Sequence, residues 1–229
     1  NGTPLKPHNE YTAELTVKTN NGTIKKSLTF STGFLEKSWR GCFITDPSYK
    51  FVEKSISPKV LEFHKSFNLN NKKVVSATAY ITAIGTYDFF LNGKRVNNTF
   101  LCPGFTSYKH QLQYQTYDVT NLLNDSNEID IPVAGGWAVG SYVFTRKNRI
   151  TDKIQSLLFE LHIKYEDGEE VIVSDDSWEV ADKSRFLLAD IYDGETYDAS
   201  INRDDYVYHK VGYHKLPFKP TLLADYGAP

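Results

Sequence analysis

The chain has 229 residues, of which 40% are hydrophobic and 14% aromatic, and its formal net charge at pH 7 is −2. This length and apolar content suit one large domain or two small domains with a packed core. A net charge this close to zero gives no electrostatic reason to expect binding to nucleic acid or to an anionic membrane, and no apolar run is long enough to span a bilayer.

The N-terminal part of the chain has the pattern of a domain end. The sequence begins at Asn1 and contains no methionine, so we expect it to be a piece of a longer protein. Residues 11–19 and 23–31 are strand-like runs joined by an Asn-Asn-Gly turn, which predicts a β-hairpin. Because nothing before this hairpin would complete a sheet, we interpret residues 1–35 as the last strands of a preceding β-domain.

Short runs of alternating apolar and polar residues follow along most of the chain. The predicted strands cover residues 39–45, 61–69, 74–84, 87–91, 112–117, 127–133, 157–165, 171–173 and 178–180. Between two of them, Asn92-Gly93 provides the positive φ angles of a two-residue hairpin turn, and the return strand begins at Lys94.

Helical signals are weak throughout the sequence. Asp118 is a good N-cap residue, but the residues after it support one helical turn at most. Many short strands, with turn signals about every eight to twelve residues, predict an all-β fold, an antiparallel β-sandwich or jelly roll, over residues 36–208. The proline-rich residues 209–229 are expected to form an extended linker toward the next domain.

The cysteines and two of the tryptophans are assigned structural roles. Cys42 and Cys102 are sixty residues apart and fit neither a disulfide framework nor a metal site, so we expect two free, buried thiols. Trp39 and Trp178 lie in predicted strands with an alternating pattern and are expected in the core.

Asp193 and Glu195 are the first candidate for chemistry. Two residues apart on a predicted strand, they would face the same way at about 7 Å. Inverting glycosidases hold their carboxyl pair at roughly 6.5–9.5 Å, so the spacing is compatible with catalysis. Acidic pairs of this kind are nevertheless common on strands, and we favour a structural role for both residues.

A second candidate is the group of asparagines at and after the hairpin turn. Amide oxygens can ligate calcium, so Asn97 and Asn98 predict a Ca²⁺ site that an exposed pair of sugar hydroxyls would complete. The alternative is turn chemistry, because asparagine is favoured wherever φ is positive, and this is the interpretation we adopt for Asn92.

Trp137 lies in a glycine-flanked loop at 135–140 and is the third candidate. An indole between glycines can offer its face to the apolar face of a sugar, although a core tryptophan with small neighbours gives the same pattern. Tyr142 is a weaker candidate of the same kind. The six histidines lack metal-ligand spacing, and the sequence contains neither a nucleophile elbow nor a phosphate-binding glycine loop, so the residues alone do not indicate catalysis.

A series of segments in order resembles the N-terminal β-sandwich region of bacterial α-L-rhamnosidases of glycoside hydrolase family 78. It begins with Ala-Ile-Gly-Thr-Tyr at 83–87, Leu-Asn-Gly-Lys-Arg-Val at 91–96 and Pro-Gly-Phe-Thr-Ser-Tyr at 103–108. It continues with Tyr-Gln-Thr-Tyr-Asp-Val-Thr at 114–120, Gly-Trp at 136–137, Asp-Asp-Ser-Trp at 175–178 and Tyr-Asp-Gly-Glu-Thr-Tyr-Asp-Ala at 192–199.

The resemblance implies a place in an enzyme that removes terminal α-L-rhamnose from glycosides by an inverting mechanism. In such enzymes the catalytic carboxylates lie in a downstream (α/α)6 barrel, which this chain lacks, so Asp193 and Glu195 would not be the acid and base. The expected function is that of a non-catalytic structural domain, with the downstream barrel and rhamnose-containing glycosides as partners. Residues 1–35 then resemble the end of a fibronectin-III-like domain.

The resemblance also leaves an alternative, a Ca²⁺-dependent L-rhamnose-binding module. In some relatives Ca²⁺ bridges protein and sugar, and the loop after the Asn-Gly-Lys-Arg-Val strand, often acidic, supplies ligands. Asn97 and Asn98 occupy that loop here, and Asn148 is a further candidate ligand. Because ligand charge helps to set Ca²⁺ affinity, the missing carboxylates argue against calcium, and no cofactor is firmly expected.

Overall fold

The computed structural model describes residues 4–35, 38–49, 58–141, 151–181 and 183–224. The chain divides into two compact units, Asn1–Arg40 and Gly41–Pro229, and each is considered by itself. Among the described residues, no helix is both long and apolar enough to cross a membrane.

The first unit contains a single β-hairpin. Strands β1 (Glu10–Thr19) and β2 (Gly22–Ser31) pair in antiparallel fashion along their whole length, with Thr19 opposite Gly22 at the turn. This is the predicted hairpin, and its strand residues are almost all exposed. Trp39 also lies in this unit, stacked on Phe34 with ring centroids 4.2 Å apart. The prediction that Trp39 belongs to the core of the sandwich is therefore wrong.

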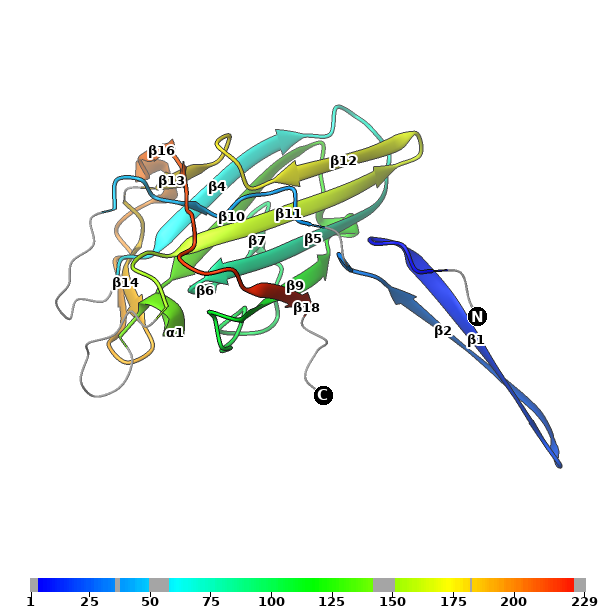
Figure 1. The fold of residues 1–229 in the computed structure, drawn as a ribbon. Helices are drawn as coiled ribbons and strands as arrows, with labels where there is room; N and C mark the ends of the chain where they lie inside the picture. Colours follow the sequence, from blue (N-terminus) through cyan, green and yellow to red (C-terminus); the bar gives the residue numbers. More distant parts are fainter. Residues whose placement is uncertain (1–3, 36–37, 50–57, 142–150, 182, 225–229) are drawn as a thin grey trace. The chain divides into compact units, whose positions relative to one another are not determined.

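The second unit is built on two seven-stranded sheets (Figure 1). The first has the strand order β16-β13-β4-β10-β7-β8, with β6 also paired to β10. Its strands are β4 (Leu61–Asn68), β6 (Thr86–Tyr87), β7 (Phe90–Leu91), β8 (Lys94–Arg95), β10 (Ser126–Ala134), β13 (Glu179–Ala181) and β16 (Tyr208–Lys210). The central strands run antiparallel, with Ile131 of β10 opposite Phe63 of β4.

The second sheet has the order β17-β3-β11-β5-β9-β18, with β12 also paired to β11. Its strands are β3 (Ile44–Thr45), β5 (Val74–Ile84), β9 (Gln111–Asp118), β11 (Ser156–Tyr165), β12 (Gly168–Val173), β17 (Gly212–Tyr213) and β18 (Thr221–Ala224). The β11–β12 hairpin lies where the alternating pattern placed it. The all-β, antiparallel sandwich prediction is confirmed.

The core lies between the two sheets because most of the alternate, inward-facing residues of the central strands are apolar and buried. Phe159 of β11 contacts Phe89 and Trp178, with ring centroids 5.9 and 5.2 Å apart. Trp178 is fully buried, as predicted. Such aromatic pairs stabilise the fold by more than the burial of their surface area alone, so this cluster helps to set how the two sheets pack on each other.

The predicted turn at Asn92-Gly93 is present, with φ angles of 53° and 73° between β7 and β8. After Asp118 there is only the single turn η1 (Thr120–Leu122), as expected. The glycine-flanked loop around Trp137 is instead a one-turn helix, α1 (Gly136–Val139). Glycine is needed at its start, because Gly136 has φ +52° and a Cβ there would lie 2.6 Å from Thr86 Cγ2.

Two further expectations differ from the structure. Within residues 209–229, β17 and β18 and the end of β16 pair with the sheets, so the segment is extended but much of it is bound to the sandwich. Proline is unfavourable within a helix but is tolerated on an edge strand, so the proline pattern alone could not distinguish a free linker from a paired edge strand. Both thiols are free, but Cys42 is exposed and only Cys102 is buried.

A small cap covers part of the outer face of the first sheet. It consists of the hairpin β14 (Phe186–Asp190) and β15 (Gly194–Tyr197) and the following turn η2 (Arg203–Asp205). Arg203 forms ion pairs with Glu128 and Asp130, which point outward from β10 between its core residues. We call residues 183–208 the cap.

Candidate functional site

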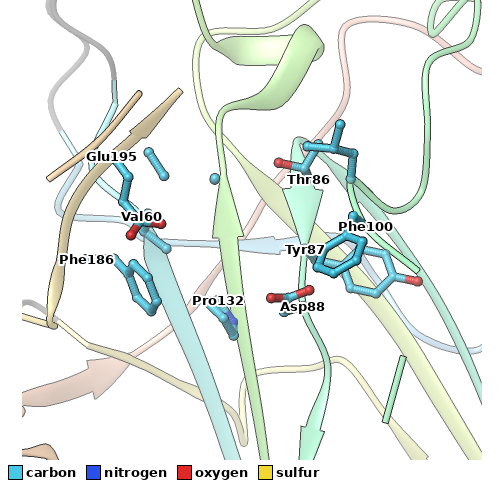
Figure 2. A pocket seen from close by; sticks show the side chains of 11 residues that line it. Val60, Thr86, Tyr87, Asp88, Phe100, Pro132, Phe186 and Glu195 are labelled. Atoms are coloured by element: carbon cyan, nitrogen blue, oxygen red, sulfur yellow. The ribbon is translucent and has the colours of Figure 1, made fainter. Parts of the chain in front are cut away.

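A cleft lies between the cap and the end of the first sheet (Figure 2). It has a volume of about 220 Å³, and an adjacent cavity of about 250 Å³ shares Thr86, Leu101, Ala134, Ala189 and Glu195 with it. We call these two cavities together the cap cleft. It is lined by Val60, Thr86, Tyr87, Asp88, Phe100, Leu101, Pro132, Ala134, Gly136, Phe186, Ala189, Asp190, Ile191, Gly194 and Glu195.

The walls of the cap cleft come from separate parts of the chain. Figure 2 shows Pro132 of β10 at the floor, Phe186 and Glu195 of the cap on one side, and Thr86 and Phe100 on the other. Phe100 is 79% exposed and lies against the Arg95 guanidinium, 4.6 Å from the ring centroid. The result is an open, mostly apolar cleft with a few polar groups, which is the general character of small-molecule sites.

Polar side chains also face the cap cleft. Thr86 is 91% buried. Asp88 Oδ1 accepts hydrogen bonds from Arg95 at 2.7 Å and from the Asn97 amide at 3.1 Å, so its charge is largely compensated. Glu195 is exposed on β15. The cleft is thus lined by the Thr86 hydroxyl and by the carboxylates of Asp88, Asp190 and Glu195.

The turn of the cap hairpin is held to the sandwich by Asp190. Its Oδ2 accepts a hydrogen bond from the Ser141 backbone N–H at 2.6 Å, and its Oδ1 accepts from the backbone of Tyr192 at 2.8 Å and of Asp193 at 3.1 Å. A Cβ on Gly140 would lie 2.5 Å from Asp190 Oδ2, so a side chain at that position would displace the carboxylate. This brace sets the position of the cap wall.

A half-buried acidic group lies beneath the other end of the cap. The pKa of Glu62 is raised to about 7, first by burial and then by the charge of Asp130, against opposing hydrogen bonds from Ser184 and Tyr206. Asp130 also contacts His64 Nδ1 at 2.8 Å and is ion-paired with Arg203. This cluster links β4, β10 and the cap, and Glu62 lies opposite Pro132 of the cleft floor in the β4–β10 pair.

The two asparagines proposed as ligands have different environments. Asn97 is 98% buried, its Oδ1 accepts from the Phe89 N–H at 2.9 Å, and its amide donates to Asp88 and to the Thr99 carbonyl at 2.9 Å. Asn98 is exposed. The Asn97 side chain is therefore committed to the turn, in the manner expected of turn chemistry.

Trp137 lies beside a different cavity. It is half-buried, and it lines a space of about 320 Å³ together with Phe105, Tyr108, Lys109 and His110. Its ring contacts Phe105 edge to face, with centroids 5.9 Å apart. Neither Asn97 nor Asn98 is among the residues lining this cavity, so the structure does not bring the three proposed sugar-binding residues together.

The acidic pair at 193 and 195 does not have the geometry assumed from the sequence. β15 begins at Gly194, so Asp193 lies in the hairpin turn and the two residues are not on one strand. Ser141 Oγ donates to Asp193 Oδ2 at 3.2 Å, which gives that carboxylate a structural contact. Glu195 faces the cap cleft instead.

Tyr142 and Asn148 lie outside the described residues, so their predicted roles are untested. Among the residues that the structure does describe, no group of three or more His, Cys, Asp or Glu side chains is arranged to hold a metal ion. The contribution of Thr86, Phe100 and Phe186 to a cleft was missed, because a threonine in an apolar strand and two isolated phenylalanines carry no sequence signal of a site.

The family model of the α-L-rhamnosidase N-terminal domain matches residues 72–226, more than half of the chain. The chain belongs to this family. The rhamnosidase N-terminal domain is 33% identical over 179 residues to an α-L-rhamnosidase of Formosa agariphila, covering 75% of this chain and 19% of that protein. It is 39% identical over 140 residues to one of Streptomyces avermitilis, covering 60% and 13%.

Comparison with solved structures agrees with this assignment. A crystal structure of α-L-rhamnosidase from Aspergillus terreus superposes with a TM-score of 0.81 and 26% identity, covering 94% of this chain and 26% of that one. This rhamnosidase N-terminal domain thus spans about a fifth or less of the length of these curated relatives.

Proposed function

We propose that this chain is a non-catalytic β-sandwich of an α-L-rhamnosidase and supports hydrolysis of terminal α-L-rhamnose from glycosides as a structural domain. The observation that carries the proposal is the family match over residues 72–226, which is to an N-terminal domain rather than to a whole enzyme. The displacement of Asp193 from the strand of Glu195 supports it, because it removes the paired-carboxylate arrangement that catalysis would need.

The partner in this proposal is a catalytic (α/α)6 barrel encoded further along the same gene, acting by an inverting mechanism. A fully packed core between two seven-stranded sheets suits a rigid support. In the same proposal, residues 1–35 belong to a preceding fibronectin-III-like domain, and residues 209–229 lead toward the barrel. The compact-unit boundary at Arg40 lies five residues beyond the proposed end of the first part.

The proposal is tested by assaying the isolated chain with p-nitrophenyl α-L-rhamnoside. We expect no hydrolysis above background. In the full-length gene product, deletion of residues 41–224 should lower the melting temperature of the rest and its yield of active enzyme. Hydrolysis by the isolated chain, or a deletion that leaves stability and activity unchanged, would contradict a structural role.

Calcium-dependent L-rhamnose binding through Asn97, Asn98, Trp137, Tyr142 and Asn148 stays a prediction. The internal hydrogen bonds of Asn97 and the separate cavity beside Trp137 count against it. Calorimetry with L-rhamnose tests it directly. Heat that disappears with a chelator and in Asn98→Ala would restore it as the leading function.

A further inference from the structure

We propose that the cavity beside Trp137 binds a flat aromatic monocarboxylate, whose rings pack against the aromatic side chains while its carboxylate pairs with the Lys109 ammonium. We call this cavity the aromatic pocket. It has a volume of about 320 Å³ and is lined by residues 105–110, Trp137 and Thr151. The pocket shares no lining residue with the cap cleft, and binding there does not depend on the structural role proposed above.

Three aromatic rings meet at the aromatic pocket. Phe105 lies edge to face against Tyr108 and against Trp137, with ring centroids 5.9 Å apart in both pairs and interplanar angles of 90° and 67°. Phe105 is 59% exposed, so more than half of its surface is accessible to a ligand. Rings set at steep angles present both faces and edges, and a flat aromatic ligand can extend this arrangement through edge-to-face and offset contacts.

The walls of the aromatic pocket are held in place by the fold. Tyr108 is buried, and its hydroxyl donates to the backbone carbonyl four residues earlier at 3.2 Å. The turn that follows is closed by a hydrogen bond of 2.9 Å from the Gln111 N–H to the Ser107 carbonyl. Trp137 packs against the small apolar cluster around Leu112. A pocket fixed in this way loses little side-chain freedom when a ligand binds.

The charged groups at the aromatic pocket are positive. Lys109 and His110 are exposed on its lining, and none of the described residues that line it is an aspartate or a glutamate. The nearest acid in the sequence to the lining residue Thr151 is Asp152, which is paired with His214 at 2.7 Å. A cationic ligand would therefore be repelled, whereas a carboxylate would accept a charge-assisted hydrogen bond from Lys109.

The same lining is poorly suited to a sugar. Sugar hydroxyls need acceptors, and the described lining lacks the carboxylates and carboxamides that would accept from them. Two of its hydroxyl groups are already used as donors, Thr106 to the Gln111 carbonyl at 2.7 Å and Tyr108 within its own turn. A carboxylate requires only donors, so an aromatic acid fits both the rings and the charge of this pocket.

The volume of the aromatic pocket sets the size of the ligand. A volume of about 320 Å³ is at the lower end of the roughly 300–1,000 Å³ that is usual for small-molecule sites. One aromatic ring or two fused rings with a single carboxylate match this space. We therefore choose 2-naphthoate as the probe.

The test is NMR titration and calorimetry of the whole chain with 2-naphthoate. We expect a Kd of roughly 0.1–1 mM, typical of so small a ligand, with shifts at Phe105, Lys109 and Trp137. 2-Naphthylmethylamine has the same rings with a positive charge, and cyclohexanecarboxylate has the same charge without a flat ring. Each should bind about five-fold more weakly or less well still, and methyl α-L-rhamnopyranoside should cause no shift at Trp137.

Lys109→Gln removes the charge and should weaken 2-naphthoate binding about three- to five-fold, whereas Lys109→Arg should preserve it. Phe105→Leu replaces an exposed ring without disturbing the core, and it should weaken binding about two- to ten-fold. Lys94→Gln, at an exposed lysine of β8, and Val75→Ala, at an exposed residue of β5, are the matched controls and should bind as the wild type does.

Four results would overturn the proposal: no binding at millimolar 2-naphthoate, equal or tighter binding of the amine, binding of the rhamnoside beside Trp137 in place of 2-naphthoate, or equal affinity of Lys109→Gln, Phe105→Leu and the controls. None of these bears on the structural role, which is tested by deletion in the full-length protein. The two proposals can therefore fail separately.

Discussion

Asn92 and Asn127, 35 residues apart in the sequence, are joined by a hydrogen bond in which the Asn92 amide donates to Asn127 Oδ1 at 2.9 Å. Asn92 Oδ1 accepts from the Glu128 backbone N–H at 2.9 Å, and its amide also donates to the Leu122 carbonyl. The turn residue predicted from the sequence thus also ties the β7–β8 hairpin to the start of β10.

Asn127→Ala should destabilise the chain by about 1–3 kcal/mol, because Asn127 is 99% buried and its removal takes away one acceptor of the Asn92 amide and both side-chain partners of the Asn124 backbone. Urea denaturation measures the effect. Asn98→Ala, at an exposed asparagine in the following turn, is the control and should change stability by no more than about 0.5 kcal/mol. Equal effects of the two variants would contradict this account.

Gly85→Ala should cost about 2–4 kcal/mol, because Gly85 has φ +138° and a Cβ there would lie 2.3 Å from the Ala134 carbonyl oxygen. The same experiment with Gly168→Ala provides a matched control, since a Cβ at Gly168 meets no atom within 4 Å. That variant should melt within a degree or two of the wild type, in line with the roughly 0.5 kcal/mol typical of a surface change.

Asp46 should make folding sensitive to acid. Its side chain is fully buried; burial raises its pKa, but hydrogen bonds from Ser48 and His209 and the charge of Lys59 outweigh this and lower it below 3.8. A lowered folded-state pKa stabilises the protein above pH 3.8, and that stabilisation is lost as the pH falls through the folded-state pKa.

We expect Asp46→Asn to lower the free energy of unfolding by about 1–2 kcal/mol at pH 7 and by less below pH 4. Urea denaturation at several pH values measures this difference. Asp167→Asn, in the exposed β11–β12 turn, is the control for a general charge effect. A loss of the same size at every pH would show that Asp46 acts through shape alone.

For Glu62 we expect the opposite dependence of folding stability on pH. Its pKa rises from 4.5 to about 7, chiefly because it is buried, so the folded state holds a proton that the unfolded state has released. Stability is unaffected below pH 4.5 and falls between pH 4.5 and 7. The free energy of unfolding of Glu62→Gln should therefore exceed that of the wild type by roughly 1–3 kcal/mol at pH 8 and equal it at pH 4. An unchanged difference between these two pH values would refute the assignment.

The sequence predicts the sandwich well because its signals are local. The predicted strand at 74–84, rich in β-branched and small residues, has the same bounds as β5, and the Asn92-Gly93 turn follows from backbone sterics alone. The cap cleft has no such signal. Thr86, Phe100 and Phe186 come together only after three separate segments have paired, and that pairing is set by tertiary contacts such as Asp190 with Ser141.

The difference between local sequence signals and tertiary contacts also explains why the candidate residues do not form the sites predicted for them. Asn97 carried the right residue type for a ligand, but its amide is used by Phe89, Asp88 and Thr99. Asp193 and Glu195 have the right spacing for one face of a strand, but the strand starts between them. Residue type and spacing indicate which chemistry is available, whereas hydrogen-bond partners decide whether it is free.

The cap is attached to the sandwich largely by polar contacts, at Asp190, Arg203 and Glu62, whereas the sheets share a large apolar core. Regions with few buried apolar contacts open locally at a lower cost than the global unfolding free energy. Backbone amides of residues 186–197 should therefore exchange with deuterium well before those of β5 and β11. Since the cap forms one wall of the cleft, any molecule bound there would slow that exchange and reduce the local opening of this corner of the domain.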